Sequence, residues 1–223
     1  MRLIFSLEKL GKSLHVSLAY GTFCPSYESY IGLFREPAYS SVIQHIYHFA
    51  KTIHMSSAIR GAIPENPSSK IQVALDWLTA VALGDIHKLA SLFTDDFVHS
   101  VYPPTLNLPS RNKQQWLEYN KVALTFFKDY TTEVKEIVEG RRTVVLHTTS
   151  SAVSSTGALY NNEYVIFVHL TEDANGVYRI MSIKEFIDTL YSAEFSAEEK
   201  KRYESMGKKF NLREIAVNNG GYL

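Results

Sequence analysis

This sequence has little cysteine, no excess of charge of either sign and no long apolar stretch. Its single cysteine, Cys24, excludes an internal disulfide and any thiolate metal cluster. The 23 basic and 23 acidic residues give a formal net charge of zero, so no basic stripe is available to neutralise nucleic-acid phosphates. No apolar run approaches the roughly 20 residues needed to span a bilayer. We therefore expect a cytoplasmic protein with neither a nucleic-acid partner nor a membrane partner.

Motifs for common cofactors and metals are also missing. The chain has no glycine-rich phosphate loop, no H-E-x-x-H and no G-x-S-x-G. His45, His48 and His54 begin with a spacing of three residues, but no nearby carboxylate completes a metal site. We expect no cofactor and no metal.

Residues 1–54 differ from the rest of the chain. They hold Cys24 and four of the eight histidines, and their aromatic residues follow no sustained period of 2 or 3.6. Met55 is then followed by a polar, proline-bearing stretch of the kind that precedes a first helix. Two interpretations remain open: either residues 1–54 are an artefact of the gene prediction and the chain starts at Met55, or they form a poorly ordered N-terminal extension.

Helical periodicity dominates from residue 68 to residue 128. Ser68 is a good N-cap, Gly84 a helix stop and Asp85 a second N-cap. The pattern predicts a helix, a short helix, a short strand and a long amphipathic helix, over residues 70–83, 86–93, 97–102 and 112–128.

The period then changes to 2. Val-, Ile-, Thr- and aromatic-rich segments predict four strands, over residues 131–139, 143–153, 158–170 and 177–188. The loops between them are too short for parallel crossovers, so the strands must form an antiparallel meander. Ser196 and Glu199 fit a capping box that starts a charged last helix. We accordingly divide the chain into residues 1–54, a domain over 68–195, and a C-terminal helix and tail over 196–223.

The strand over 158–170 is apolar on both faces, with Val165 and Phe167 on one and Ile166 and Val168 on the other. A sheet that is buried on both sides needs a second cover. If helices cover one face, a partner subunit covers the other, which predicts a homodimer.

The order of these elements resembles the nuclear-transport-factor-2-like cone and, within it, the SnoaL-like group. Three sequence features carry the resemblance over about residues 70–195: His99 before Pro103 and Pro104, the run GALYNNEY at 157–164, and IKEFID at 183–188. It implies an α+β fold in which a curved antiparallel sheet wraps around a long helix and encloses a small-molecule pocket. The group includes polyketide cyclases and fungal meroterpenoid isomerases and cyclases.

His99 and Asp188 are the candidate catalytic residues. His99 lies on the same side of its strand as Phe97 and Val101, so it is a general acid or base if that side faces the pocket. Otherwise it is a core histidine bonded to a backbone carbonyl. Asp188 ends the last strand, where the resemblance places an acid near the mouth of the cone. It acts there as a base, or it caps the turn that follows.

Glu185 lies three residues before Asp188, so on a regular strand the two side chains point to opposite faces. We predict a supporting, ligand-contacting role for Glu185. The other predicted ligand contacts are aromatic or imidazole side chains: Tyr102, Trp116, Tyr119, His147 and Tyr164. Tyrosine hydroxyls can donate hydrogen bonds to a ligand carbonyl, although packing alone also explains tyrosines in these elements.

These residues favour a cofactor-independent acid/base enzyme acting on a small, largely apolar polyketide or terpenoid ketone, of isomerase, cyclase or dehydratase type. The alternative is a non-catalytic module of the same fold that binds a small molecule or dimerises. Ionisable groups that converge in an apolar cavity would favour the enzyme.

Overall fold

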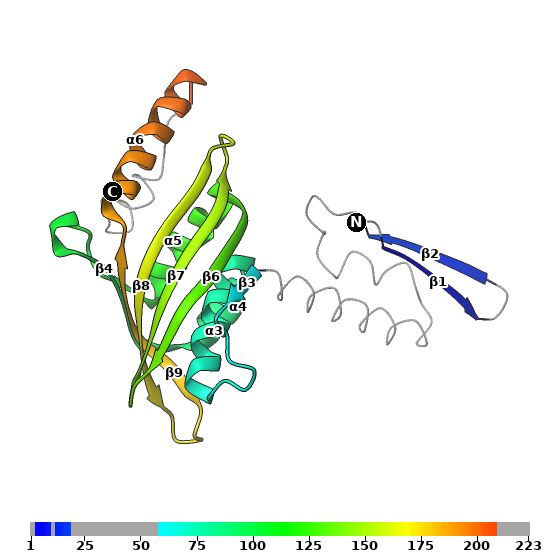
Figure 1. Ribbon diagram of the computed structural model, residues 1–223, viewed down its shortest axis with the longest axis horizontal. Helices are drawn as coiled ribbons and strands as arrows, with labels where there is room; N and C mark the ends of the chain where they lie inside the picture. The colour runs from blue at the N-terminus through cyan, green and yellow to red at the C-terminus, as the bar shows by residue number, and fades with distance from the viewer. Residues whose placement is uncertain (1–2, 10–11, 19–57, 209–223) are drawn as a thin grey trace. The chain divides into compact units, whose positions relative to one another are not determined.

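The structure, a computed structural model, describes residues 3–9, 12–18 and 58–208 (Figure 1). The chain divides into two compact units, Met1–Ala50 and Lys51–Leu223. In the first unit, β1 (Leu3–Lys9) and β2 (Lys12–Leu18) form an antiparallel hairpin. His45, His48 and His54 lie outside the described residues, and the interpretation of residues 1–54 as an extension or artefact stays a prediction.

Three helices of the second unit begin at side-chain caps. Ser68 accepts a hydrogen bond from the backbone N–H of Ile71 at the start of α3 (Ser69–Leu83), which ends at the left-handed Gly84 (φ 67°). Asp85 caps α4 (Ile86–Leu92). A capping box between Asn112 and Gln115 begins α5 (Lys113–Phe126). The three predicted helices are thus confirmed within a few residues at each end.

Seven strands form one curved, unclosed sheet in the order β3-β6-β7-β8-β9-β4-β5. Their bounds are β3 (Ile59–Gly61), β4 (Phe93–Tyr102), β5 (Arg111–Asn112), β6 (Phe127–Glu139), β7 (Thr143–Ser154), β8 (Leu159–Glu172) and β9 (Tyr178–Ile187). The 3₁₀ helix η1 (Pro104–Leu106) connects β4 to β5. The antiparallel pairing of β6, β7, β8 and β9 confirms the predicted meander, and the α+β class is confirmed with it.

β4 pairs in parallel with β9, although about 75 residues separate them in sequence. His99 is the Cα partner of Ile183, and Val101 is the partner of Glu185. On its other side β4 pairs with β5, where His99 is opposite Arg111. This edge of the sheet therefore brings the predicted site residues of β4 beside those of the last strand.

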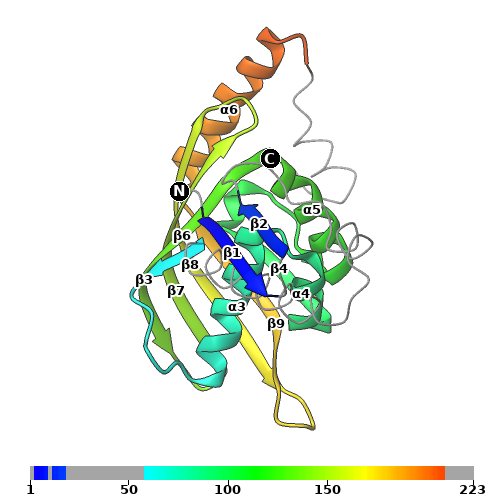
Figure 2. The same cartoon turned by 90° about the vertical axis from the view of Figure 1, so that its right-hand side faces the viewer.

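The helices α3, α4 and α5 cover one face of the sheet, which we call the inner face (Figures 1 and 2). Burial alternates strictly along β7, where Val144 and Leu146 face inward. Trp116 of α5 packs edge-on against Phe93 of β4, whose ring stacks on Phe97. These buried apolar contacts form a core between the helices and the inner face.

The opposite, outer face of the sheet carries exposed apolar side chains in the described part of the chain. On β8, Ile166 and Val168 are buried while Val165 is 37% exposed. Phe186 of β9, the cross-strand partner of Val165, is 42% exposed. In the described part of the chain, α3, α4 and α5 therefore cover the inner face, and apolar side chains of the outer face stay exposed.

The last helix, α6 (Thr189–Ser205), begins seven residues earlier than the predicted capping box. Asp188 is its N-cap and accepts a hydrogen bond from the backbone N–H of Tyr191. Glu199 is instead fully buried within the helix, where it accepts hydrogen bonds from Thr156 and pairs with Arg202. The capping-box prediction was wrong because Asp188 provides an earlier cap and Glu199 bonds to the β7–β8 turn.

Among the described residues, no helix combines the length and the apolar character needed to cross a membrane.

Candidate active site

A cavity of about 170 Å³ lies between the inner face of the sheet and the helices α3 and α5. It is slightly larger than the roughly 150 Å³ cavity that holds benzene in a well-studied case. Its walls are mostly apolar and aromatic, with Trp77 of α3 and Trp116 of α5 among them. One ring of a small organic molecule therefore fits inside.

His99 and Glu185 meet in this cavity. The imidazole Nε2 lies 3.4 Å from Oε1 of the carboxylate, within ion-pair distance. His99 is 3% exposed, and neither of its ring nitrogens has a hydrogen-bond partner in the described part of the chain. The Glu185 side chain is 19% exposed. Both nitrogens and the carboxylate thus remain available to a bound molecule.

Strand geometry explains this meeting. On β4, the side chains of Phe97 and His99 both point to the inner face. The parallel neighbour β9 presents Ile183 and Glu185 on that same face. Parallel strands lie about 4.8 Å apart. Glu185 is two residues beyond Ile183, the strand partner of His99, so its long side chain comes within contact distance of the imidazole.

Four tyrosines also line the cavity: Tyr119 of α5, Tyr130 of β6, and Tyr160 and Tyr164 of β8. The hydroxyl oxygens of Tyr160 and Tyr164 are 2.5 Å apart, and Nδ2 of Asn162 donates to the Tyr160 hydroxyl. Their spacing of four along one strand puts both rings on the same face.

Burial keeps these phenols protonated. Desolvation raises the pKa of Tyr130 to about 12, although hydrogen bonds with Ser150 and Tyr164 oppose the rise. Burial likewise raises the pKa of Tyr160, Tyr164 and Tyr119. At neutral pH the four hydroxyls are therefore neutral hydrogen-bond donors in a low-dielectric site.

Buried polar atoms without a protein partner gather at the same place. In the described part of the chain these atoms include Nε1 of Trp77, both nitrogens of His99 and the hydroxyl of Thr148, and all three residues line the cavity. Native proteins rarely leave buried polar groups unpaired. A ligand with polar groups would satisfy them.

Arg111 of β5 lies beside the cavity. It is 3% exposed, and its guanidinium carbon lies 4.3 Å from the centre of the Tyr119 ring. Its Nε has no hydrogen-bond partner among the residues that the structure describes. A desolvated cation–π contact contributes about 2 kcal/mol, whereas burying an ion costs several kcal/mol. The ring offsets only part of that cost.

Residues 74–177 match the SnoaL-like domain family, a span that begins in α3 and ends before β9. The chain carries a SnoaL-like domain.

Known proteins similar to this SnoaL-like domain include fungal ones. The chain is 26% identical over 106 residues to the protein named monooxygenase dmxR10 of Cryptosporiopsis sp. (strain 8999), with 46% of this chain and 69% of that protein covered. The pinacolase BvnE of Penicillium brevicompactum has a TM-score of 0.51 at 24% identity over 62% of this chain and 98% of that one. PrhC of Penicillium brasilianum reaches 0.54 at 15% identity, over 70% and 100%. These two structures confirm the predicted fold of the SnoaL-like domain.

Five of the eight predicted site residues line the cavity of the SnoaL-like domain: His99, Trp116, Tyr119, Tyr164 and Glu185. They come from β4, α5, β8 and β9. The pairing of β9 with both β4 and β8, together with the packing of α5 on the sheet, brings them together.

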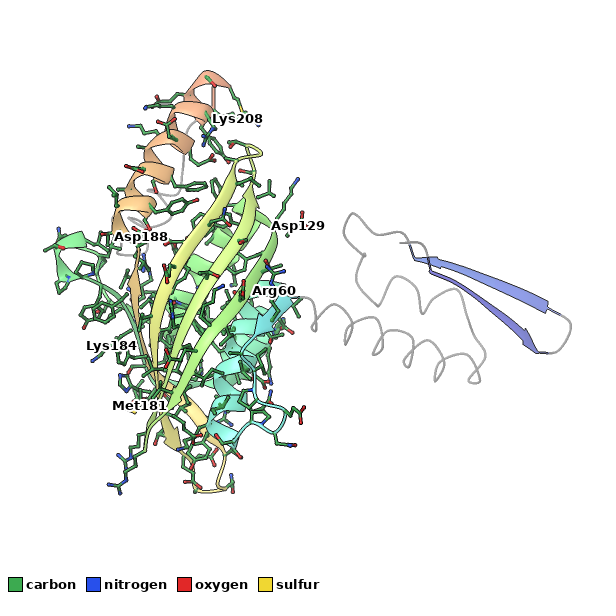
Figure 3. All side chains as sticks on the ribbon, viewed as in Figure 1. Arg60, Asp129, Met181, Lys184, Asp188 and Lys208 are labelled. Atoms are coloured by element: carbon green, nitrogen blue, oxygen red, sulfur yellow. The ribbon has the colours of Figure 1, made fainter. Side chains whose placement is uncertain are left out.

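The expectation that Asp188 shares a cavity with His99 is not met. Asp188 is exposed at the junction of β9 and α6, does not line the cavity, and caps the helix (Figure 3). The capping interpretation of Asp188 is the one that this geometry supports. Glu185, three residues earlier and on the opposite face, takes the place beside His99.

Tyr102 and His147 lie away from the cavity as well. The Tyr102 ring stacks on Phe186 of the outer face. His147, an odd-numbered residue of β7, points outward, where its Nε2 contacts Oε1 of Glu163 at 2.5 Å. Alternation with buried Leu146 and Thr148 decides its face.

Sequence reasoning missed Trp77, Asn120, Tyr130, Thr148 and Tyr160 as lining residues. Tyr160 lies four residues before the predicted Tyr164. Residues four apart on a strand share a face, so this spacing could have identified Tyr160 as a lining residue. Nothing comparable marked Tyr130, which precedes the predicted strand over residues 131–139 and belongs to the longer observed strand β6.

The described residues hold no group of three His, Cys, Asp or Glu side chains arranged to bind a metal ion.

Tyr191 and Phe195 of α6 pack against the ring of Tyr160. The helix α6 therefore packs against Tyr160, one of the four tyrosines that line the cavity.

Proposed function

We propose that the SnoaL-like domain is a cofactor-independent enzyme that moves protons on a small organic ketone of polyketide or terpenoid type, as an isomerase, cyclase or dehydratase does. One observation carries the proposal: a buried imidazole and a carboxylate meet beside neutral phenols in an apolar cavity. The relative dmxR10 is itself named as an enzyme, a monooxygenase, which supports an enzymatic role but not this reaction.

Glu185 acts as the base. Its carboxylate takes a proton from the carbon next to the substrate carbonyl, and the electron pair of the C–H bond moves into a carbon–carbon double bond. The carbonyl oxygen becomes an enolate oxygen. In a ketone with a β,γ carbon–carbon double bond, Glu185 then returns the proton to the γ-carbon. The carbonyl re-forms, the double bond becomes conjugated with it, and the enzyme is unchanged.

The tyrosines hold the enolate oxygen. Tyr164 and Tyr119 are hydrogen-bond donors whose protons are retained at operating pH because burial raises their pKa. Donors that are fixed before the reaction stabilise developing charge without reorganising. His99, whose nitrogens are unpaired, either completes this set of donors or relays the proton from Glu185.

A small aryl ketone tests the proposal without knowledge of the natural substrate. 1-Indanone is incubated with the protein in D₂O, and deuterium exchange at its α-carbon is followed by NMR. Binding is read from the fluorescence of Trp77 and Trp116, the two tryptophans of the chain, both in the cavity wall. We expect exchange faster than in buffer alone.

Two other results would contradict the enzyme. If 1-indanone binds but exchange equals that in buffer, the domain is a non-catalytic binding module, the alternative function of this fold. If neither binding nor exchange occurs up to millimolar ketone, the cavity does not take this class of molecule.

We also propose that a second copy of the chain covers the outer face. The support is the row of exposed apolar side chains there, which includes Val98, Val165, Met181 and Phe186. The proposed assembly is a homodimer.

A further inference from the structure

Arg111 occupies an unusual position for an arginine. It belongs to the two-residue strand β5, and its backbone pairs with that of His99. Directly opposite residues of an antiparallel pair point to the same face. Arg111 therefore faces inward with His99, and its guanidinium covers the ring of Tyr119, a cavity-lining residue.

No carboxylate of the described residues forms an ion pair with this buried arginine. More exposed arginines of the same domain do find acids: Arg60 faces Glu133, and Arg179 faces Asp173. The buried guanidinium carries the larger desolvation cost, and within residues 58–208 the contact given for it is the ring of Tyr119. Buried charges in proteins are normally paired, so the missing partner is expected from outside the chain.

Two charges of opposite sign lie near Tyr119. Burial is the main cause of its raised pKa, the Arg111 guanidinium over its ring lowers that pKa, and the Glu185 carboxylate raises it. A ligand with one anionic group would orient that group toward Arg111. Its neutral carbonyl would then lie toward Glu185 and His99.

We propose that the natural ligand is an organic carboxylate, a keto acid in the chemistry proposed above, and that Arg111 binds its carboxylate group. The planar fork of a guanidinium matches a carboxylate and can donate two parallel hydrogen bonds to it. This inference rests on the proposed function in one respect: the carboxylate belongs to the molecule whose ketone the cavity binds.

A matched pair of probes tests the charge by itself. 4-Acetylbenzoate and 4-acetylbenzamide have nearly the same shape and both carry a ketone, but only the first is anionic. Their dissociation constants are measured by calorimetry with the full chain. For the natural protein we expect the carboxylate to bind at least about tenfold more tightly than the amide.

Two variants then assign the preference to Arg111. Arg111→Met keeps most of the side-chain length without the charge, and we expect it to bind both probes with the affinity that the natural protein has for the amide. Arg111→Lys keeps the charge without the fork, and we expect an intermediate preference. Circular dichroism checks that each variant is folded.

Each outcome bears on a different claim. Equal binding of the two probes by the natural protein overturns the carboxylate inference and leaves the proposed function standing. A preference that survives in Arg111→Met overturns the role of Arg111. Failure of both probes to bind argues against the proposed function itself. The comparison in the natural protein is decisive even if Arg111→Met does not fold.

Discussion

Nε2 of His99 lies 3.4 Å from Oε1 of Glu185, across two parallel strands that the chain reaches some 85 residues apart. The contact is an ion-pair distance without a hydrogen bond, and the imidazole has no other polar partner among the described residues. Catalytic hydrogen bonds in unliganded sites are often long and tighten when the substrate binds. The pair is therefore the centre of the proposed chemistry.

Glu185→Gln should abolish most of the exchange of 1-indanone. The amide keeps the shape of the side chain but cannot accept the proton, so we expect a loss of about 10²–10⁴ in rate with folding intact. Asp188→Asn is the matched control, because asparagine caps a helix as well as aspartate does and Asp188 lies outside the cavity. The opposite pattern, with Asp188→Asn inactive and Glu185→Gln active, would restore Asp188 as the base.

Tyr164→Phe should slow exchange by removing one donor to the enolate oxygen. Loss of a single oxyanion donor costs about 10²–10³ in rate where such donors are fixed in advance. Tyr102→Phe removes a hydroxyl from a tyrosine that stacks on the outer face, and we expect it to leave the rate unchanged. Equal rates in the two variants would show that the hydroxyl of Tyr164 takes no part in the reaction.

Alkaline pH should destabilise the domain partly through Tyr130. Its pKa is about 12 in the folded chain, mainly because of burial, and about 10 when unfolded. The unfolded chain thus loses this proton first. The stabilising contribution is complete below about pH 10 and is lost as the pH rises toward 12.

Tyr130→Phe cannot ionise, so its melting temperature should fall less than that of the natural protein between about pH 8 and pH 11. Calorimetric melting at several pH values measures the difference. The other buried tyrosines titrate in both chains, and the charge of Tyr130 raises the pKa of Tyr160 and Tyr164 in the natural chain only. Parallel curves for the two chains would contradict the proposed protonation state of Tyr130.

Phe186→Lys should dissociate the proposed homodimer. Phe186 lies on the outer face beside Val165 and Tyr102, so a lysine there would bury a charge in the interface. Light scattering at micromolar concentration should give a dimer mass for the natural chain and a monomer mass for the variant. Val177→Lys is the control, since Val177 is 50% exposed in the β8–β9 turn. A natural chain with a monomer mass would refute the dimer.

A shortened chain that begins at Met55 should melt at the same temperature as the full chain. Residues 1–54 show no amphipathic pattern with which to join the core, and the first compact unit ends at Ala50. A drop of more than about 5 °C, roughly 1–2 kcal/mol for a domain of this size, would show that the segment contributes to the fold.

The sequence predicted most of the secondary structure because the local signals agreed. Caps at Ser68 and Asp85, the stop at Gly84 and the change of period after residue 128 each have a local physical cause. The one misplaced helix start shows the limit. Ser196 and Glu199 have capping-box spacing, but an earlier cap at Asp188 and the bond of Glu199 to Thr156 determine the helix.

The sequence alone determined that His99 faces the same side as Phe97 and that Glu185 and Asp188 face opposite sides, since strand periodicity decides both. It did not determine which side is the cavity. That was decided when β4 paired in parallel with β9 and α5 packed on one face, because burial of the apolar face selects the inward residues. The same packing places Glu185, rather than Asp188, beside His99, and it directs His147 outward. It also buries Arg111 beside Tyr119.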